Sequence, residues 1–118
     1  MSENRLPDYL DHMAQAEQDA CGFVDGLSKA DFLADRRTQQ AVIMSLIIIG
    51  EATMRVMDRY AGFAQKHAEV PWRSMRGMRN RIAHGYFDIN LDVVWDTVLT
   101  ALPELLEQLG AIRSDAGQ

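Results

Sequence analysis

The chain has 118 residues, of which 47% are apolar and 25% charged, so composition indicates one globular domain and excludes a disordered chain. Its net charge of −5 argues against nucleic acid bound over a broad surface. A single cysteine, Cys21, excludes an internal disulfide and fits a reducing cytoplasm. Because Cys21 lies in a segment with apolar periodicity, we expect a buried, inert thiol.

Membrane association is not expected. Residues 1–8 lack a charged segment followed by an apolar one, so no signal peptide is predicted. The most apolar run, residues 41–49, is much shorter than the roughly 20 residues that span a bilayer. We therefore predict a soluble, cytoplasmic protein without a membrane partner, folded as a single domain over residues 1–118.

Every long segment has helical spacing, and none alternates with the period of a strand. The first helix is predicted from about Asp8 to Leu27, with residues at spacings of three and four on a mostly apolar face. His12 lies on its polar side, where we expect no special role. Ser28, followed by Asp31 three residues later, predicts a capping box for a short helical turn.

The second helix is predicted from about residue 37 to residue 60, and it is apolar around nearly its whole circumference between residues 41 and 50. So small a chain cannot surround such a helix alone, so we expect part of it to pack on a second copy in a homodimer. Glu51 is either a surface residue or a buried partner for an arginine, and the bidentate fit of arginine to carboxylate favours the second. Residues 62–70 are predicted to form a polar connection in which His67 is solvated.

Pro71 is well placed to begin a third helix, which is predicted to end near His84 because Gly85 follows. Asn90 is the predicted N-cap of a fourth helix that runs to about residue 109, and Pro103 should kink or split it. The tail from about residue 112 is expected to fray. Four main helices with short connections predict an all-α, antiparallel helical bundle.

The basic residues gather in one stretch. Residues 71–84 contain four arginines and no acid, although the chain as a whole is acidic. A local basic patch on an acidic body suits one phosphate or a short anionic strand, and Arg73, Arg76 and Arg81 are candidate RNA or phosphate contacts beside Arg79. The alternative is that these arginines pair with acids from neighbouring helices.

A helical wheel divides the third helix into two faces. The core face carries Trp72, Met75, Met78 and Ile82, and the opposite face carries Arg73, Arg76, Asn80 and His84. Arg79 lies roughly 140° from His84 on this wheel, so a regular helix does not bring the two together. Three arrangements remain open: the helix distorts near Gly85, the long arginine closes the gap, or the pair forms between two chains.

These residue types suit RNA cleavage without a metal. Histidine exchanges a proton near neutral pH, and arginine stays charged with donors that match phosphate oxygens. A base can activate the ribose 2′-hydroxyl for attack on the adjacent phosphorus while the cation stabilises the phosphorane. No metal-ligand spacing and no phosphate-binding glycine loop occur, so no metal or cofactor is expected. Tyr86 adds a phenol that could stack on a base. Alternatively, His84 has no catalytic role and only interacts favourably with the dipole at the C-terminal end of its helix.

The stretch Arg79-Asn80, three further residues, His84, Gly85 and Tyr86 resembles the R-N-x-x-x-H-x-Y motif of the HEPN superfamily, in its HepT-like branch. The resemblance covers roughly residues 40–106, through Ile49-Gly50-Glu51-Ala52, Val70-Pro71-Trp72-Arg73, Tyr86-Phe87-Asp88-Ile89-Asn90, Val93-Val94-Trp95 and Leu102-Pro103-Glu104-Leu105.

The resemblance implies a helical dimer whose motif helices face each other across a composite cleft. It implies a metal-independent endoribonuclease that is the toxin of a type VII toxin–antitoxin pair. By position, Arg79 would be the phosphate-stabilising cation, His84 the base or acid, and Asn80 the residue that orients them. The antitoxin would be an MNT-type nucleotidyltransferase that silences the toxin by transferring AMP to Tyr86.

Two other interpretations stay open. The chain could be a non-catalytic subunit that binds a nucleotide or substrate for a nucleotidyltransferase, in which case Tyr86 need not be modified. It could also be a helical dimer with a structural network between arginine and Glu51 and no ligand.

Overall fold

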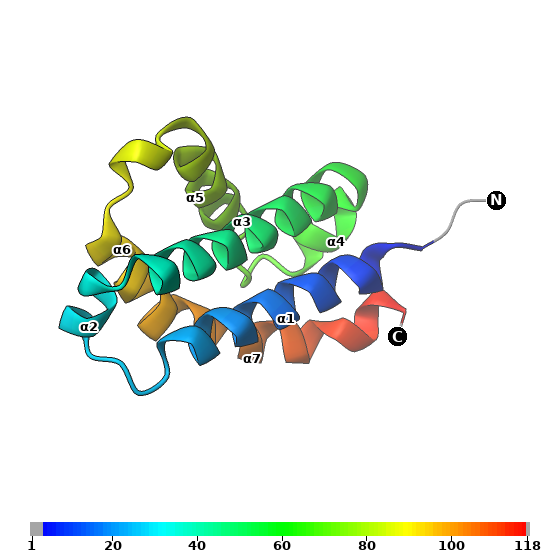
Figure 1. Ribbon diagram of the computed structural model, residues 1–118. Coiled ribbons are helices and arrows are strands. Elements are labelled where there is room, and N and C mark those ends of the chain that lie inside the picture. Colours follow the sequence, from blue (N-terminus) through cyan, green and yellow to red (C-terminus); the bar gives the residue numbers. More distant parts are fainter. Residues whose placement is uncertain (1–3, 118) are drawn as a thin grey trace.

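Helices make up nearly all of the chain that the structure, a computed structural model, describes, namely residues 4–117 (Figure 1). No strand occurs in this range, so the prediction of an all-α fold is confirmed. The α-helices are α1 (Leu6–Val24), α2 (Lys29–Ala34), α3 (Arg36–Arg59), α4 (Ala61–Lys66), α5 (Trp72–His84), α6 (Leu91–Asp96) and α7 (Leu102–Ile112). The shorter turns are η1 (Tyr86–Asp88), η2 (Thr97–Ala101) and η3 (Arg113–Ala116).

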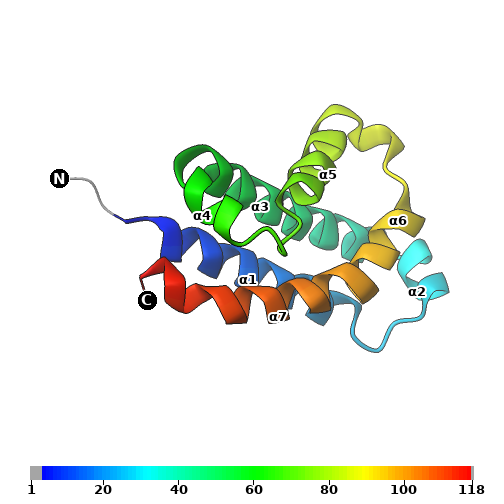
Figure 2. The same cartoon turned by 180° about the vertical axis from the view of Figure 1, so that it is seen from behind.

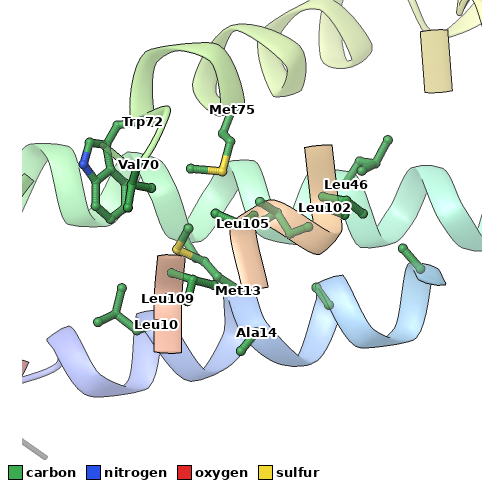
Figure 3. Packing of buried hydrophobic residues seen from close by; sticks show 14 of the residues in the cluster. Leu10, Met13, Ala14, Leu46, Val70, Trp72, Met75, Leu102, Leu105 and Leu109 are labelled. Atoms are coloured by element: carbon green, nitrogen blue, oxygen red, sulfur yellow. The ribbon is translucent and has the colours of Figure 1, made fainter. Parts of the chain in front are cut away.

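The long helices form a bundle in which α1 packs against both α3 and α7. Helix α5 lies steeply across α3, and α6 leads into α7 beside α1 (Figures 1 and 2). The core lies between these helices, and Met75 reaches into it from α5 above Met13 and Leu105 (Figure 3). Helix α5 crosses α3 instead of lying along it, and after α1 it is the element in broadest contact with α3.

The predicted helix caps are present. Ser28 and Asp31 form a complete capping box at the start of α2. The side chain of Asn90 accepts hydrogen bonds from the backbone N–H groups of Asp92 and Val93, so it caps α6. Helix α1 ends at Val24, three residues before the predicted end.

Two predictions about polar segments are wrong. The connection over residues 62–70 contains most of α4, and His67 after it is only 15% exposed. The His67 ring packs on Phe63, and its Nε2 lies 2.8 Å from an Asp115 carboxylate oxygen. The described part of the tail does not fray, because η3 buries Ala116, whose carbonyl accepts a hydrogen bond from Asn4. Contacts between distant parts of the chain, His67 with Asp115 and Asn4 with Ala116, order the two segments. The local sequence does not encode such contacts.

The last long helical segment is interrupted as Pro103 predicted. A π-helical turn, η2, separates α6 from α7, and Pro103 lies in the first turn of α7. Proline has no N–H to donate to the carbonyl four residues earlier, so the regular hydrogen-bond ladder cannot pass through this position. The interruption leaves Val98 and Leu102 buried on the core side.

Helix α3 is long and apolar enough, by length and composition, to cross a membrane. However, Val42, Leu46 and Ile49 are fully buried in the bundle, which is typical of the central helix of a globular domain. Its other side leaves Met44 and Ile48 exposed, at 56% and 40%. Helix α3 is therefore apolar on both sides as predicted, and the rest of this chain buries only one of them.

Candidate active site

Gly50 is the point of closest approach between α3 and α5. A Cβ atom placed on Gly50 would lie 2.2 Å from the Cβ of Arg79 and 3.3 Å from the carbonyl oxygen of Met75. Such a separation is far inside van der Waals contact, so at this crossing only glycine fits without a shift of α5. The absence of a side chain at Gly50 therefore sets where Arg79 lies.

Arg79 is held on both sides of its guanidinium group. Its Nε donates to Oε1 of Glu51 at 2.6 Å, and Nη2 lies 2.6 Å from the same oxygen. Its Nη1 donates to Oδ1 of Asn80 at 3.2 Å. The side chains of Arg79 and Glu51 are 27% and 41% exposed, so the pair is half-buried and accessible to a ligand. The expected partnership of Glu51 with an arginine is present, although Glu51 is not fully buried.

His84 lies apart from this pair. It is the exposed last residue of α5, and the helix is regular up to it, with Gly85 N–H donating to the carbonyl of Arg81. Among the described residues no hydrogen bond or ion pair joins His84 to Arg79 or Asn80. Neither a distortion near Gly85 nor the reach of Arg79 closes the gap within one chain.

Tyr86 extends the site beyond the end of α5. It lies in η1, 62% exposed, and its ring packs against Phe87 with ring centroids 4.4 Å apart. Phe87 is 87% exposed, so the two aromatic rings form a solvent-facing pair beside His84. Sequence reasoning did not single out Phe87. The one available signal was that Phe87 is apolar although it lies in a predicted loop.

The flanking arginines differ from Arg79. Within the described residues Arg73, Arg76 and Arg81 form no ion pair with an acid, so the alternative that the patch is neutralised by neighbouring helices holds for Arg79 alone. Arg73 borders a cavity beside α4, whereas Arg81 folds over Gly77 toward the groove between α5 and α6. The structure therefore does not bring these three candidate phosphate contacts together in one cluster.

Sequence reasoning missed a groove on the other side of Glu51, between α1 and α3. Arg5, His12, Arg55 and Arg59 line it together with Glu51. The available signal was the four-residue spacing of Glu51, Arg55 and Arg59, which places all three on one face of α3. Arg5, the residue just before α1, has no such signal, because only the packing of α1 on α3 brings it to the groove.

In residues 4–117 no three His, Cys, Asp or Glu side chains gather in a way that could hold a metal ion. The polar groups that converge here are a guanidinium, a carboxylate and an amide, with an imidazole and a phenol nearby. This set offers donors to a phosphate and a group that transfers protons near neutral pH.

Known proteins provide a separate line of comparison. Residues 13–112 match the family model described as "Ribonuclease HepT-like". A protein of Thermococcus cleftensis named "Probable ribonuclease HepT" is 38% identical over 106 residues, which cover 90% of this chain and 94% of its own. A protein of Caldanaerobacter subterraneus named "Putative RNase" is 38% identical over 104 residues, which cover 88% of this chain and 90% of that protein. No solved structure matches. The chain therefore belongs to the HepT-like ribonuclease family.

Proposed function

We propose that this protein is an endoribonuclease that needs no metal and cleaves RNA in a cleft shared by two copies of the chain. Membership of a ribonuclease family supports the activity. The observation that carries the site is Arg79, which Glu51 and Asn80 hold in one orientation at the α3–α5 crossing. A cation fixed before substrate arrives stabilises developing charge without reorganisation, which is the most effective form of electrostatic catalysis.

The proposed reaction uses the ribose 2′-hydroxyl as nucleophile. His84 accepts its proton, and the 2′-oxygen bonds to the adjacent phosphorus while Arg79 stabilises the negative phosphorane oxygens. The bond from phosphorus to the 5′-oxygen then breaks, and this oxygen receives a proton from an acid. The products are a 2′,3′-cyclic phosphate and a 5′-hydroxyl, and no oxidant or other reactant is consumed.

The separation of the two side chains supports a second copy. Arg79 and His84 lie roughly 140° apart around a regular helix, and each is accessible. Met44 and Ile48 are exposed on α3, on the same helix as Glu51, and burying them against a second copy would remove apolar surface from water. In a two-fold dimer the Arg79 of each chain can face the His84 of the other, which gives two equivalent sites.

Cleavage assays in the presence of a chelator test this proposal. Wild-type protein should cleave RNA to cyclic-phosphate ends, and His84→Ala should lower the rate by about 10²–10⁴, the usual contribution of a positioned acid or base. Arg79→Ala should have an effect of similar size. Arg36→Ala, which removes an exposed arginine at the far end of α3, is the matched control and should cleave normally. Retention of full activity by His84→Ala would contradict the proposed site.

The proposal includes the regulation of the enzyme. The protein would act in the cytoplasm as the toxin of a toxin–antitoxin pair, and its antitoxin would be an MNT-type nucleotidyltransferase. The Tyr86 hydroxyl would attack the α-phosphorus of ATP, and pyrophosphate would leave. Support comes from the 62% exposure of Tyr86, two residues from His84. The added nucleotide would bring bulk and negative charge to a cleft that must admit RNA.

Modification and toxicity can be tested together. Quantitative transfer of AMP to Tyr86, followed by mass spectrometry, should abolish RNA binding and cleavage. Tyr86→Phe should still cleave RNA but should not be modified, so the antitoxin should fail to silence it by this route. Expression of wild type without the partner should slow growth, and Arg79→Ala or His84→Ala should relieve the effect. Full cleavage by quantitatively modified protein would refute this regulation.

A further inference from the structure

We propose that the groove between α1 and α3 is a phosphate-binding subsite for the RNA strand next to the scissile bond. Its polar lining comprises Arg5, Tyr9, His12, Glu51, Arg55 and Arg59, and we call it the arginine groove. Ile48 also lines the groove, so the groove borders the proposed dimer interface. The proposal deepens the proposed function, because it assigns the path that the same substrate takes away from Arg79.

The arginine groove begins at the candidate active site. Glu51 lines the groove and also binds Arg79, so the groove and the guanidinium of Arg79 share this carboxylate. Along α3 the side chains at positions 51, 55 and 59 follow one another by about 6 Å per step, from a rise of 1.5 Å per residue. This step is comparable to the separation of successive phosphates in an extended strand. A strand with one phosphate at Arg79 can therefore place later phosphates at Arg55 and Arg59.

The charges of the groove favour an anion. Arg55 is exposed and makes no hydrogen bond or ion pair within residues 4–117. Arg59 donates one N–H to the hydroxyl of Tyr9 at 2.9 Å, which orients the guanidinium and leaves its other donors available. Glu51, the acid in the lining of the groove, is paired with Arg79, and Asp8 is paired with Arg5. The groove is therefore positive on a protein whose net charge is −5.

The lining also indicates which part of RNA would bind. Tyr9 is 8% exposed and its hydroxyl is occupied by Arg59, so it offers no face on which a base could stack. The guanidinium groups of the groove match phosphate oxygens, and contacts to the phosphate backbone carry no sequence information. An acidic protein surface would meet the same charges, but the continuity of the groove with Arg79 favours the substrate of that site.

The test compares a long single-stranded RNA with a dinucleoside phosphate, which spans the scissile bond but cannot reach the groove. Binding of the long RNA is measured in the His84→Ala background, so that it is not cleaved during titration. Arg55→Ala should raise its dissociation constant about tenfold, the scale of a lost charge-assisted hydrogen bond. The slope of log affinity against log salt should become shallower by about 0.7, the value for one phosphate contact on a single strand.

The controls isolate the groove from the fold and from catalysis. Arg55→Ala alone should cleave the dinucleoside phosphate at the wild-type rate, and Arg55→Lys should retain most of the affinity for long RNA. Arg36→Ala removes the same charge from the same helix and should bind long RNA normally. The proposal is overturned if Arg55→Ala binds long RNA like Arg36→Ala, or if it loses activity equally on both substrates. The proposal is also overturned if Arg55→Ala weakens binding to the nucleotidyltransferase partner and leaves binding of long RNA unchanged.

The two proposals fail in different ways. If wild type cleaves no RNA but long RNA still binds with the predicted dependence on Arg55, the arginine groove stands and the proposed catalysis falls. If wild type cleaves RNA and Arg55 affects neither long-RNA affinity nor the salt slope, the catalysis stands and the groove falls.

Discussion

Gly50 shows how a residue without a side chain can position an arginine of the candidate site. Any larger residue at this position must push α5 away from α3, because its Cβ would overlap the Cβ of Arg79. The displacement would also separate Arg79 from Glu51, whose hydrogen bond depends on the close crossing. We therefore expect stability and activity to depend on the same contact.

Gly50→Ala should destabilise the protein by about 1–3 kcal/mol, as expected for an overpacked core site, and should lower the rate of cleavage. Gly110→Ala is the matched control, because a Cβ there meets nothing within 4 Å and alanine is favoured in a helix by about 0.5–1 kcal/mol. Urea unfolding measures both variants. Equal stability of the two would mean that the crossing tolerates a side chain.

Cys21 should be inert, for a reason the structure supplies. Burial raises the pKa of its thiol to about 12, and the hydrogen bond from Sγ to a Glu17 carboxylate oxygen at 3.0 Å adds to the effect. Because the thiolate is the reactive form, alkylation of the folded protein should stay slow from neutral pH up to pH 9, the ordinary pKa of a thiol, and beyond. Urea-unfolded protein should react much faster at pH 9. Equal rates would contradict a raised pKa.

The candidate site was only partly predictable from single residues. The separation of Arg79 from His84 followed from the helical wheel, and the partnership of Glu51 with an arginine followed from the apolar flanks of Glu51. The close approach at Gly50 did not, because it depends on the angle at which α5 crosses α3. The arginine groove was missed for a similar reason: Arg5 joins Arg55 and Arg59 only once α1 has packed on α3.

At the scale of elements, the helix ends were predictable where a side chain caps them. Ser28 and Asn90 carry their signals locally, and both caps are present. Helix α4 and η3 were missed because their order comes from contacts between distant segments, such as His67 with Asp115. Pro103 gave a local signal for an interrupted helix, although not for the π-helical form of η2.

The Asn90 cap should contribute to stability and to the path of the chain after Tyr86. Asn90→Ala removes the acceptor for the N–H groups of Asp92 and Val93 and should cost about 1 kcal/mol. Asn90→Asp keeps an acceptor and should cost much less. Thermal or urea unfolding measures the difference, with Gln40→Ala on the exposed side of α3 as a control. A cost for Asn90→Asp as large as for Asn90→Ala would show that the cap is unimportant.

At the scale of the whole molecule, the exposed apolar side of α3 makes a prediction about assembly. Met44→Glu should place a charge in the proposed interface, so light scattering should report a monomer, and cleavage should fall with the dimer. Phe23→Glu changes an exposed apolar residue on α1, outside the proposed interface, and should leave both properties unchanged. A dimeric, active Met44→Glu protein would place the interface elsewhere.

The central claim is that Arg79 of one chain acts with His84 of the other. Arg79→Ala and His84→Ala proteins should each be inactive alone. Refolding them together forms mixed dimers, in which one of the two sites contains both wild-type residues. With random pairing, half of the dimers are mixed, so the mixture should recover about a quarter of wild-type cleavage. If the mixture stays as inactive as either variant alone, Arg79 and His84 do not act across two chains and the account is contradicted.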